Sequence, residues 1–280
     1  MNEAKPTVVA KTADEEWHRI LLAGKVGTGK SFLTLSGERN IMVLYSDRMG
    51  GDADIKGLED VGVHVHRISY SDPRTSMMNK ITQLRTSELA EKKIRTIVWD
   101  TATYTQQQAR DKTAGSNANS MTLKKHGQAS NDILDITQAL FGLPCHIVIL
   151  AHLKEIPIMG LDGNGKPTKI GSTWQPDMMD SVYKRISREA SLMGYTWKKR
   201  VDGKDDRYGV CFVEKLGNIV FSDTKAPNGW TGTEPANIRL WLKRLTEDAS
   251  KRREAARQAL LNDIDQSKDE PEPEAVSEEE

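Results

Sequence analysis

The segment Gly24-Lys25-Val26-Gly27-Thr28-Gly29-Lys30-Ser31 decides the fold class, because it fits the pattern G-x-x-x-x-G-K-[S/T] in full. An apolar run at residues 19–23 precedes it, and a helical pattern begins at Lys30. Glycines in such a turn let successive backbone N–H groups face one phosphate, and the N-terminus of the following helix adds partial positive charge. The segment therefore predicts a phosphate-binding loop. The alternative is a plain glycine-rich turn between a strand and a helix.

The residues of this loop also indicate its ligands. The Lys30 ammonium suits the β- and γ-phosphates of ATP, and the Ser31 hydroxyl suits Mg²⁺. We expect ATP to contact the loop through Gly24, Lys25, Val26, Gly27, Thr28, Gly29, Lys30, Ser31 and Phe32.

Outside this segment, short apolar runs alternate with amphipathic stretches, which is typical of an α/β fold with a mostly parallel sheet flanked by helices. Strands are expected at residues 41–45, 63–68, 96–100 and 145–151, and helices near 55–61 and at 73–93 and 129–141. Residues 195–200, 208–216 and 219–222 are expected to be antiparallel strands that extend the sheet, before a helix over 235–261. Two polar segments, about 105–126 and 153–176, are expected to be irregular loops, which at this length are usually functional or disordered.

Polar side chains follow three of the expected strands and are the candidate catalytic residues. Asp100 lies at the edge where α/β sheets bind ligands and is expected to hold the water shell of Mg²⁺, a helix N-cap being the alternative. Asp47 is a candidate general base for the attacking water, with Asp52 and Asp54 as nearby competitors and a turn as the alternative. His152 is a candidate sensor of the γ-phosphate, the alternative being an ordinary surface histidine.

The order of these motifs resembles the RecA-like ATPase core over about residues 17–230. It is most similar to the phage-encoded RecA-like ATPases that act with single-strand-annealing proteins. The phosphate-binding loop is followed by strands that end in Ser46-Asp47, in Asp100-Thr101 and in His152. The resemblance implies that Asp47, where the family usually has glutamate, activates water, that Asp100 is the Walker B acid, and that His152 couples nucleotide state to DNA.

The resemblance also implies partners. In RecA-like recombinases, loops after the Walker B strand and the sensor strand line a DNA channel, and the matching segments here are 105–128 and 153–176. The implied contacts to single-stranded DNA are Arg110, Lys112, Lys124, Lys125, His126, Lys154, Lys166, Lys169 and Trp174. Cations neutralise phosphates and the indole stacks on a base, whereas a solvated loop is the alternative.

RecA-like sites are completed in a ring or filament, with ATP between identical subunits and a cation supplied by the neighbour. Lys225 is the first candidate for this catalytic cation, and Lys215 and Arg207 are the others. A cation there neutralises the transition state. An ordinary exposed lysine is the alternative.

Charge and composition limit the other possibilities. Lys plus Arg and Asp plus Glu each number 40, yet residues 263–280 hold nine acids and one base, which leaves a net charge of +8 on the first 262 residues. A mildly basic core permits a polyanionic partner. The acidic tail is interpreted as a competitor for the DNA site, as a docking segment for a single-strand-binding or annealing protein, or as a solubilising tail.

Cysteine usage and hydropathy indicate a cytoplasmic protein, in the host cytoplasm if the chain is phage-encoded. Cys145 and Cys211 lie in expected strands and are typical of buried free thiols in a reducing compartment. No apolar run approaches the roughly 20 residues of a membrane span, so no membrane partner is expected.

These patterns divide the chain into a flexible leader (1–16), a RecA-like ATPase domain (17–245), a helical extension (246–262) and a disordered acidic tail (263–280). The favoured function is an ATPase that binds single-stranded DNA in recombination or single-strand annealing, with hydrolysis stimulated by DNA. One alternative is a P-loop ATPase that drives assembly or remodelling of another protein. The other is a small-molecule kinase, which the lack of an arginine-rich lid disfavours.

Overall fold

A computed structural model describes residues 16–33, 36, 40–46, 59, 63–115, 121–199, 207–212, 214–216, 219–221, 224–227, 230, 233–234 and 237–268. The strands are β1 (Arg19–Gly24), β2 (Ile41–Tyr45), β3 (His64–Arg67), β4 (Thr96–Asp100), β5 (His146–Leu161), β6 (Pro167–Pro176), β7 (Leu192–Lys199), β8 (Arg207–Cys211), β9 (Lys215–Leu216), β10 (Ile219–Val220) and β11 (Thr233–Glu234). The helices are α1 (Lys30–Leu33), α3 (Pro73–Gln83), the π-helical turn η2 (Leu84–Glu88), α4 (Leu89–Glu91), α5 (Ala102–Ala114), α6 (Leu123–Phe141), α7 (Asp180–Glu189) and α8 (Ile238–Lys268).

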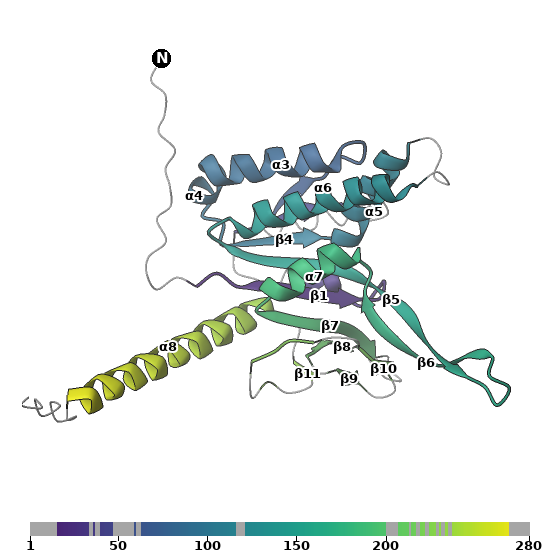
Figure 1. Cartoon of the computed structure of the whole chain (residues 1–280). Helices are drawn as coiled ribbons and strands as arrows, with labels where there is room; N and C mark the ends of the chain where they lie inside the picture. The colour runs from purple at the N-terminus through teal and green to yellow at the C-terminus, as the bar shows by residue number, and fades with distance from the viewer. Residues whose placement is uncertain are drawn as a thin grey trace, which may run out of the picture.

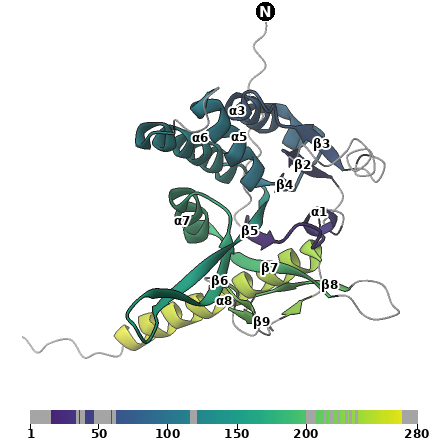
Figure 2. The same cartoon turned by 90° about the vertical axis from the view of Figure 1, so that its right-hand side faces the viewer.

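The main sheet confirms the expected fold class, an α/β core with a mostly parallel sheet flanked by helices and with antiparallel strands on its C-terminal side. Its strands lie in the order β11-β8-β7-β1-β5-β4-β2-β3, and β6 pairs with β5 outside this path (Figures 1 and 2). Every pair from β7 to β3 is parallel, whereas β8 and β11 are antiparallel to their neighbours. The parallel strands end at a common edge, where α/β sheets bind ligands.

The expectation of an antiparallel strand at residues 195–200 is confirmed for one of its two neighbours only: β7 is antiparallel to β8, from Tyr195↔Cys211 to Lys199↔Arg207, but not to β1. Strand β7 begins earlier, at Leu192, and runs parallel to β1. The reason is helix α7, which the sequence patterns did not indicate. It returns the chain across the sheet after β6, as the connection between parallel strands requires.

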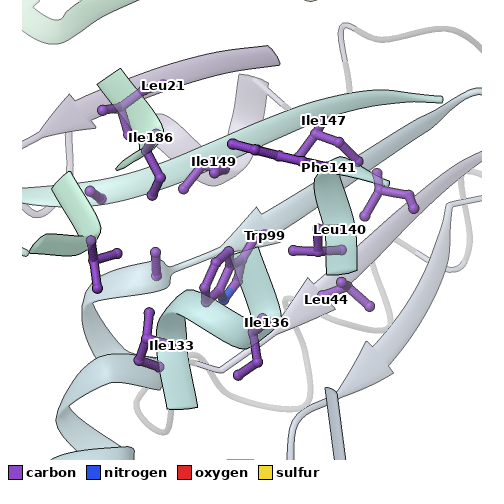
Figure 3. Close-up of a cluster of buried hydrophobic side chains, with 14 of the residues drawn as sticks. Leu21, Leu44, Trp99, Ile133, Ile136, Leu140, Phe141, Ile147, Ile149 and Ile186 are labelled. Atoms are coloured by element: carbon purple, nitrogen blue, oxygen red, sulfur yellow. The ribbon is translucent and has the colours of Figure 1, made fainter. Parts of the chain in front are cut away.

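The core has one layer on each face of the sheet. The larger layer packs under α3, α6 and α7, and Figure 3 shows part of it: Leu21, Leu44, Trp99, Ile133, Ile136, Leu140, Phe141, Ile147, Ile149 and Ile186. On the other face, Leu33 of α1 and Trp241 of α8 belong to the second layer. Each fully buried large apolar side chain contributes about 1.5–3 kcal/mol, so the two layers fix the sheet that carries the site.

The polar segment at 105–126 is mostly helical, contrary to the expected loop. Helix α5 begins after its N-cap Thr101, and α6 begins after its N-cap Thr122, six residues before the expected start at residue 129. Polar residues of α5 are buried because they have partners in the core. Trp99 Nε1 donates to Thr105 Oγ1 over 2.8 Å, and Gln106 Oε1 accepts from the backbone of Met179. The polar composition of this segment therefore belongs to a helix whose polar side chains form buried hydrogen bonds, not to a loop.

The second polar segment, 153–176, is a β-hairpin and not an irregular loop. Strand β5 continues past the sheet to Leu161 and pairs with β6 from Leu153↔Pro176 to Leu161↔Pro167. The hairpin projects from the molecule as a long arm (Figures 1 and 2). Its turn is closed by Asp162, whose Oδ1 accepts from the backbone N–H groups of Asn164 and Lys166. Glycines placed at a hairpin turn explain the composition that suggested a loop.

The C-terminal helix is longer than expected. Helix α8 ends at Lys268 and so includes six residues of the expected disordered tail. No proline interrupts residues 238–268, and the first proline after the helix starts is Pro271. The helix expected at 55–61 lies outside the described residues except for Glu59. No helix in the described part of the chain is long and apolar enough to cross a membrane.

Candidate nucleotide-binding site

The phosphate-binding loop lies at the carboxyl end of β1, between β1 and α1. Gly27 and Gly29 have φ values of 76° and 78°, a region that favours glycine. A Cβ on Gly24 would lie 1.8 Å from Thr196 Oγ1 and 2.6 Å from Thr28 Oγ1. The two threonine hydroxyls are themselves 2.7 Å apart, so they tie the loop to β7. Glycine at these three positions is required for the observed backbone path.

Lys30 directs its side chain back into the loop. Its ammonium donates to the carbonyl oxygens of Gly24 at 3.0 Å and Lys25 at 2.9 Å, and the residue is only 6% exposed. Ser31 is exposed at the start of α1. Phe32 belongs to the same helix, but its side chain lies outside the described residues. The loop therefore brings a buried cation and an accessible hydroxyl together, which fits a phosphate ligand with its metal ion.

Asp100 ends β4, with β5 between it and the loop strand β1. The residue is 1% exposed, and its backbone carbonyl accepts from Ser46 N over 2.7 Å. Ser46 Oγ also donates to Thr101 O over 2.7 Å, and Gln108 Nε2 donates to Ser46 O over 2.9 Å. These bonds fix the ends of β2 and β4 side by side. Asp47, the next residue in the sequence after Ser46, lies outside the described residues.

His152 lies beside the phosphate-binding loop, because it pairs in register with Gly24. Its backbone N–H donates to Thr103 Oγ1 over 2.9 Å, and Thr103 Oγ1 in turn donates to Asp177 O over 3.0 Å. The imidazole packs edge-on against Tyr104, with ring centroids 4.9 Å apart. The first turn of α5 therefore connects the end of β4 with the base of the hairpin.

Trp174 makes a second contact between the hairpin and the loop. The Lys25 ammonium lies 3.9 Å from the centroid of the Trp174 ring, within cation–π range. The indole is half-buried against the core. The sequence implied that Trp174 stacks on a DNA base, whereas the structure places its ring against the phosphate-binding loop.

The other candidate DNA contacts lie on helices α5 and α6 and on the hairpin. Arg110 and Lys112 lie on α5, with Lys124, Lys125 and His126 at the start of α6, whereas Lys154, Lys166 and Lys169 lie on the hairpin. Four of the lysines have protein partners in the structure: Lys112 with Asp72, Lys125 with Ala114 O, Lys154 with Met178 O, and Lys169 with Glu155. The hydrogen bond from Lys112, followed by that from the Thr75 backbone N–H, lowers the pKa of the Asp72 carboxyl to about 2.

Lys225 lies away from the phosphate-binding loop of its own chain. It bridges Met193 near the start of β7, and Met193 pairs with Leu21, three residues before Gly24. With His18, Glu189 and Arg252 it lines a cavity of about 340 Å³ at the opposite edge of the sheet. Arg207 is exposed on β8, and the side chain of Lys215 lies outside the described residues.

Three residues of this site carry no motif and were not identified from the sequence: Ser46, Thr103 and Thr196. Each acts through a hydrogen bond to a residue distant in sequence, so no local pattern marks it. The only available signal is position: Ser46 directly precedes Asp47, and Thr103 follows Asp100 by three residues.

The glycine-rich loop after β1, the buried Lys30 and the acidic end of β4 define the class of protein, a P-loop ATPase. Residues 17–230 match the family model described as AAA domain, which is more than half of the chain. The chain therefore belongs to this AAA-domain family.

Two solved structures show a distant similarity. The chain is 12% identical to the flagellar accessory protein FlaH from Methanocaldococcus jannaschii, covering 69% of this chain and 76% of that one, with a TM-score of 0.36. It is 11% identical to a prototypical ATPase from the type III secretion system of pathogenic bacteria, covering 64% of this chain but only 50% of that one, with a TM-score of 0.40. No curated protein matches the chain.

Proposed function

We propose that this AAA-domain protein hydrolyses ATP with Mg²⁺ and uses nucleotide state to control its grip on single-stranded DNA in recombination or single-strand annealing. The observation that carries the proposal is the contact of Lys25 in the phosphate-binding loop with Trp174 of the hairpin. A change of ligand at the loop alters the surroundings of Lys25, and through the contact of Lys25 with Trp174 it alters the base of the hairpin. The backbone bonds of His152 provide a second connection between the same elements.

Each residue of the site has a separate role in ATP hydrolysis. Lys30 binds the β- and γ-phosphates, and Ser31 and Asp100 hold the metal ion directly or through water. Bound Mg²⁺ neutralises charge on the phosphates. Asp47 takes a proton from the attacking water, and the oxygen of that water bonds to the γ-phosphorus. The bond between the γ-phosphorus and the oxygen that bridges it to the β-phosphate breaks, which releases ADP and inorganic phosphate. His152 senses the γ-phosphate.

The proposed DNA contact rests on the cations of the hairpin and of α6. Lys166 at the hairpin turn and Lys124 on α6 are exposed, so they are accessible to phosphates. Lys112 and Lys169 first have to leave Asp72 and Glu155, which reduces their net contribution. Single-strand-binding or annealing proteins are the proposed protein partners of the acidic tail.

The position of Lys225 supports an assembly in which ATP lies between subunits of a ring or filament. Because Lys225 lies at the opposite edge of the sheet from Gly24, its role at an ATP γ-phosphate requires the site of a neighbouring subunit. Hydrolysis then depends on assembly and rises with protein concentration.

ATP hydrolysis with and without single-stranded DNA tests the proposal. We expect DNA to raise the rate for the wild type, and Lys30→Ala to abolish hydrolysis under both conditions, because the phosphates lose their buried cation. Lys184→Ala, an exposed lysine on α7, is the matched control and is expected to behave as the wild type. DNA that neither binds with ATP present nor changes the rate contradicts the DNA role. A wild type without hydrolysis contradicts the ATPase itself.

A second function, remodelling of a protein partner, is favoured by the apolar surface of the hairpin. Ile158, Met159, Leu161 and Ile170 are 43–72% exposed along the same arm. Two double variants distinguish the functions. Lys166→Ser with Lys169→Ser is expected to weaken DNA binding and flatten its salt dependence, because phosphate contacts release counterions. If Met159→Ser with Ile170→Ser removes DNA stimulation and the lysine pair has no effect, the arm binds its partner through apolar contacts.

A further inference from the structure

Tyr208 of β8 lies against the phosphate-binding loop, although no motif marks it. Its ring edge is so close to Gly29 that a Cβ built on Gly29 would lie 2.9 Å from Tyr208 Cδ1. The side chain is nevertheless 43% exposed, so part of the ring is accessible. Lys198, the partner of Tyr208 across the β7–β8 pair, has its ammonium 5.5 Å from the ring centroid.

The order of strands defines which end of a bound nucleotide faces this ring. Asp100 lies two strands from β1 on one side, with β5 between, and Tyr208 lies two strands from β1 on the other side, with β7 between. Asp100 would hold the metal ion at the γ-phosphate side, so the γ-phosphate end of a bound triphosphate would face Asp100. The nucleoside end then points toward β7 and β8. Two strands span about 10 Å, a distance that a nucleoside attached to the bound phosphates can cover.

We propose that Tyr208 is the stacking surface for the nucleobase of the bound triphosphate. The inference rests on the proposed nucleotide binding and assigns the part of the site that recognises the base. An aromatic ring stacks on any base through its π-face, and a purine offers the larger area. The ligand class is therefore a purine nucleoside triphosphate, with the positive charge of Lys198 near the ring adding attraction for a phosphate-bearing ligand.

The experiment compares the dissociation constants of ATP and of inorganic tripolyphosphate, both with Mg²⁺, by calorimetry. Tyr208→Ala is expected to weaken ATP about tenfold, the typical value of one base–aromatic stack, and to leave tripolyphosphate unchanged. Tyr208→Phe keeps the ring and is expected to bind ATP as the wild type does. Tyr70→Ala is the matched control, because Tyr70 is similarly exposed, at 38%, and bonds to Asp111 on α5.

Each other outcome overturns the inference. Equal weakening of ATP and tripolyphosphate by Tyr208→Ala means that the ring holds the loop and does not contact the base. Unchanged ATP binding means that the base lies elsewhere. In both cases wild-type ATP binding and hydrolysis leave the proposed function standing, whereas a wild type that binds neither ligand overturns both proposals.

Discussion

At Gly24, the last residue of β1, the phosphate-binding loop lies against strand β7. Thr196 Oγ1 and Thr28 Oγ1 occupy the space in which a side chain of residue 24 would lie. Thr28 Oγ1 also donates to Lys25 O over 2.7 Å, so the hydroxyls hold the loop in its curled path. Because the same contacts hold β7 against β1 and fix the loop, a side chain at residue 24 would disturb both the stability of the sheet and the shape of the site.

We therefore predict that Gly24→Ala lowers stability by about 1–3 kcal/mol, a typical cost of overpacking, and weakens ATP binding. Thr196→Ala in the same chain removes the nearest atom and is expected to restore part of both losses, since Thr28 Oγ1 remains at 2.6 Å. Urea unfolding and calorimetric titration with ATP measure the two effects. Thr196→Ala alone is the control. If the double variant is no more stable than Gly24→Ala and binds ATP no more tightly, the clash with Thr196 Oγ1 is not the reason that residue 24 must be glycine.

The residues predicted from the sequence share a feature that the missed ones lack. Lys30 belongs to a contiguous motif, and Asp100 and His152 end apolar strands, so local patterns marked all three. Thr196 contributes through a contact with Thr28, 168 positions away in sequence, which only the folded sheet creates. Sequence patterns identified groups suited to chemistry and missed those that position them.

At the scale of elements, the hairpin and helix α5 show the same limit. Both segments are polar, and polarity was interpreted as loop structure. In α5 the polar groups are satisfied in the core, as the bond from Gln108 to Ser46 shows. In the hairpin, backbone pairing between β5 and β6 replaces a hydrophobic core as the source of order. Strands β1, β2, β4 and the first part of β5 were predicted because they are buried on both faces and have continuous apolar sequences.

The hairpin has two parts: a base that contacts the rest of the molecule, and an arm, residues 159–170, that can be removed without changing the base. The contacts of Trp174 and His152 lie at the base, and the arm continues beyond the pair Ile158↔Gly171. We predict that replacing residues 159–170 with Asn-Gly, a favoured two-residue hairpin turn, preserves folding and basal ATP hydrolysis. Stimulation by single-stranded DNA is expected to be lost because Lys166 and Lys169 are removed. Steady-state ATP hydrolysis with and without single-stranded DNA tests this prediction. If DNA still stimulates the shortened protein, the DNA contact lies outside the arm.

At the scale of the whole molecule, α8 packs across one face of the sheet. It begins beside α1, where Ile238 N donates to Ser36 Oγ over 3.0 Å, and Trp241 and Leu245 are buried in the core layer of that face. Further along the helix, at the end of β1 opposite the phosphate-binding loop, His18 Nε2 lies 3.2 Å from Thr246 Oγ1. The His18 ring stacks on His146 at 5.5 Å, and His146 Nδ1 accepts from His18 N over 3.1 Å. The starts of β1 and β5 and the attached part of α8 therefore meet at two histidines, which makes this edge sensitive to protonation.

Burial, followed by the charges of His18 and Arg95, lowers the pKa of His146 to about 3, and burial also lowers the pKa of His18. An unfolded histidine takes up a proton near pH 6.5, so between about pH 6.5 and pH 3 the unfolded state binds more protons. The free energy of unfolding is thus expected to fall as pH falls through this window, by at most about 1.4 kcal/mol per pH unit for each histidine.

His146→Asn tests this directly, because its amide oxygen can accept the bond from His18 N but does not titrate in this range. We predict a shallower decline of the free energy of unfolding between pH 6.5 and pH 4 than in the wild type, measured by urea unfolding. Above pH 7 both proteins carry neutral side chains at position 146. Their difference there measures the structural cost of the substitution alone and is subtracted at each lower pH. Identical slopes after this subtraction contradict the prediction and assign the acid sensitivity to groups other than His146.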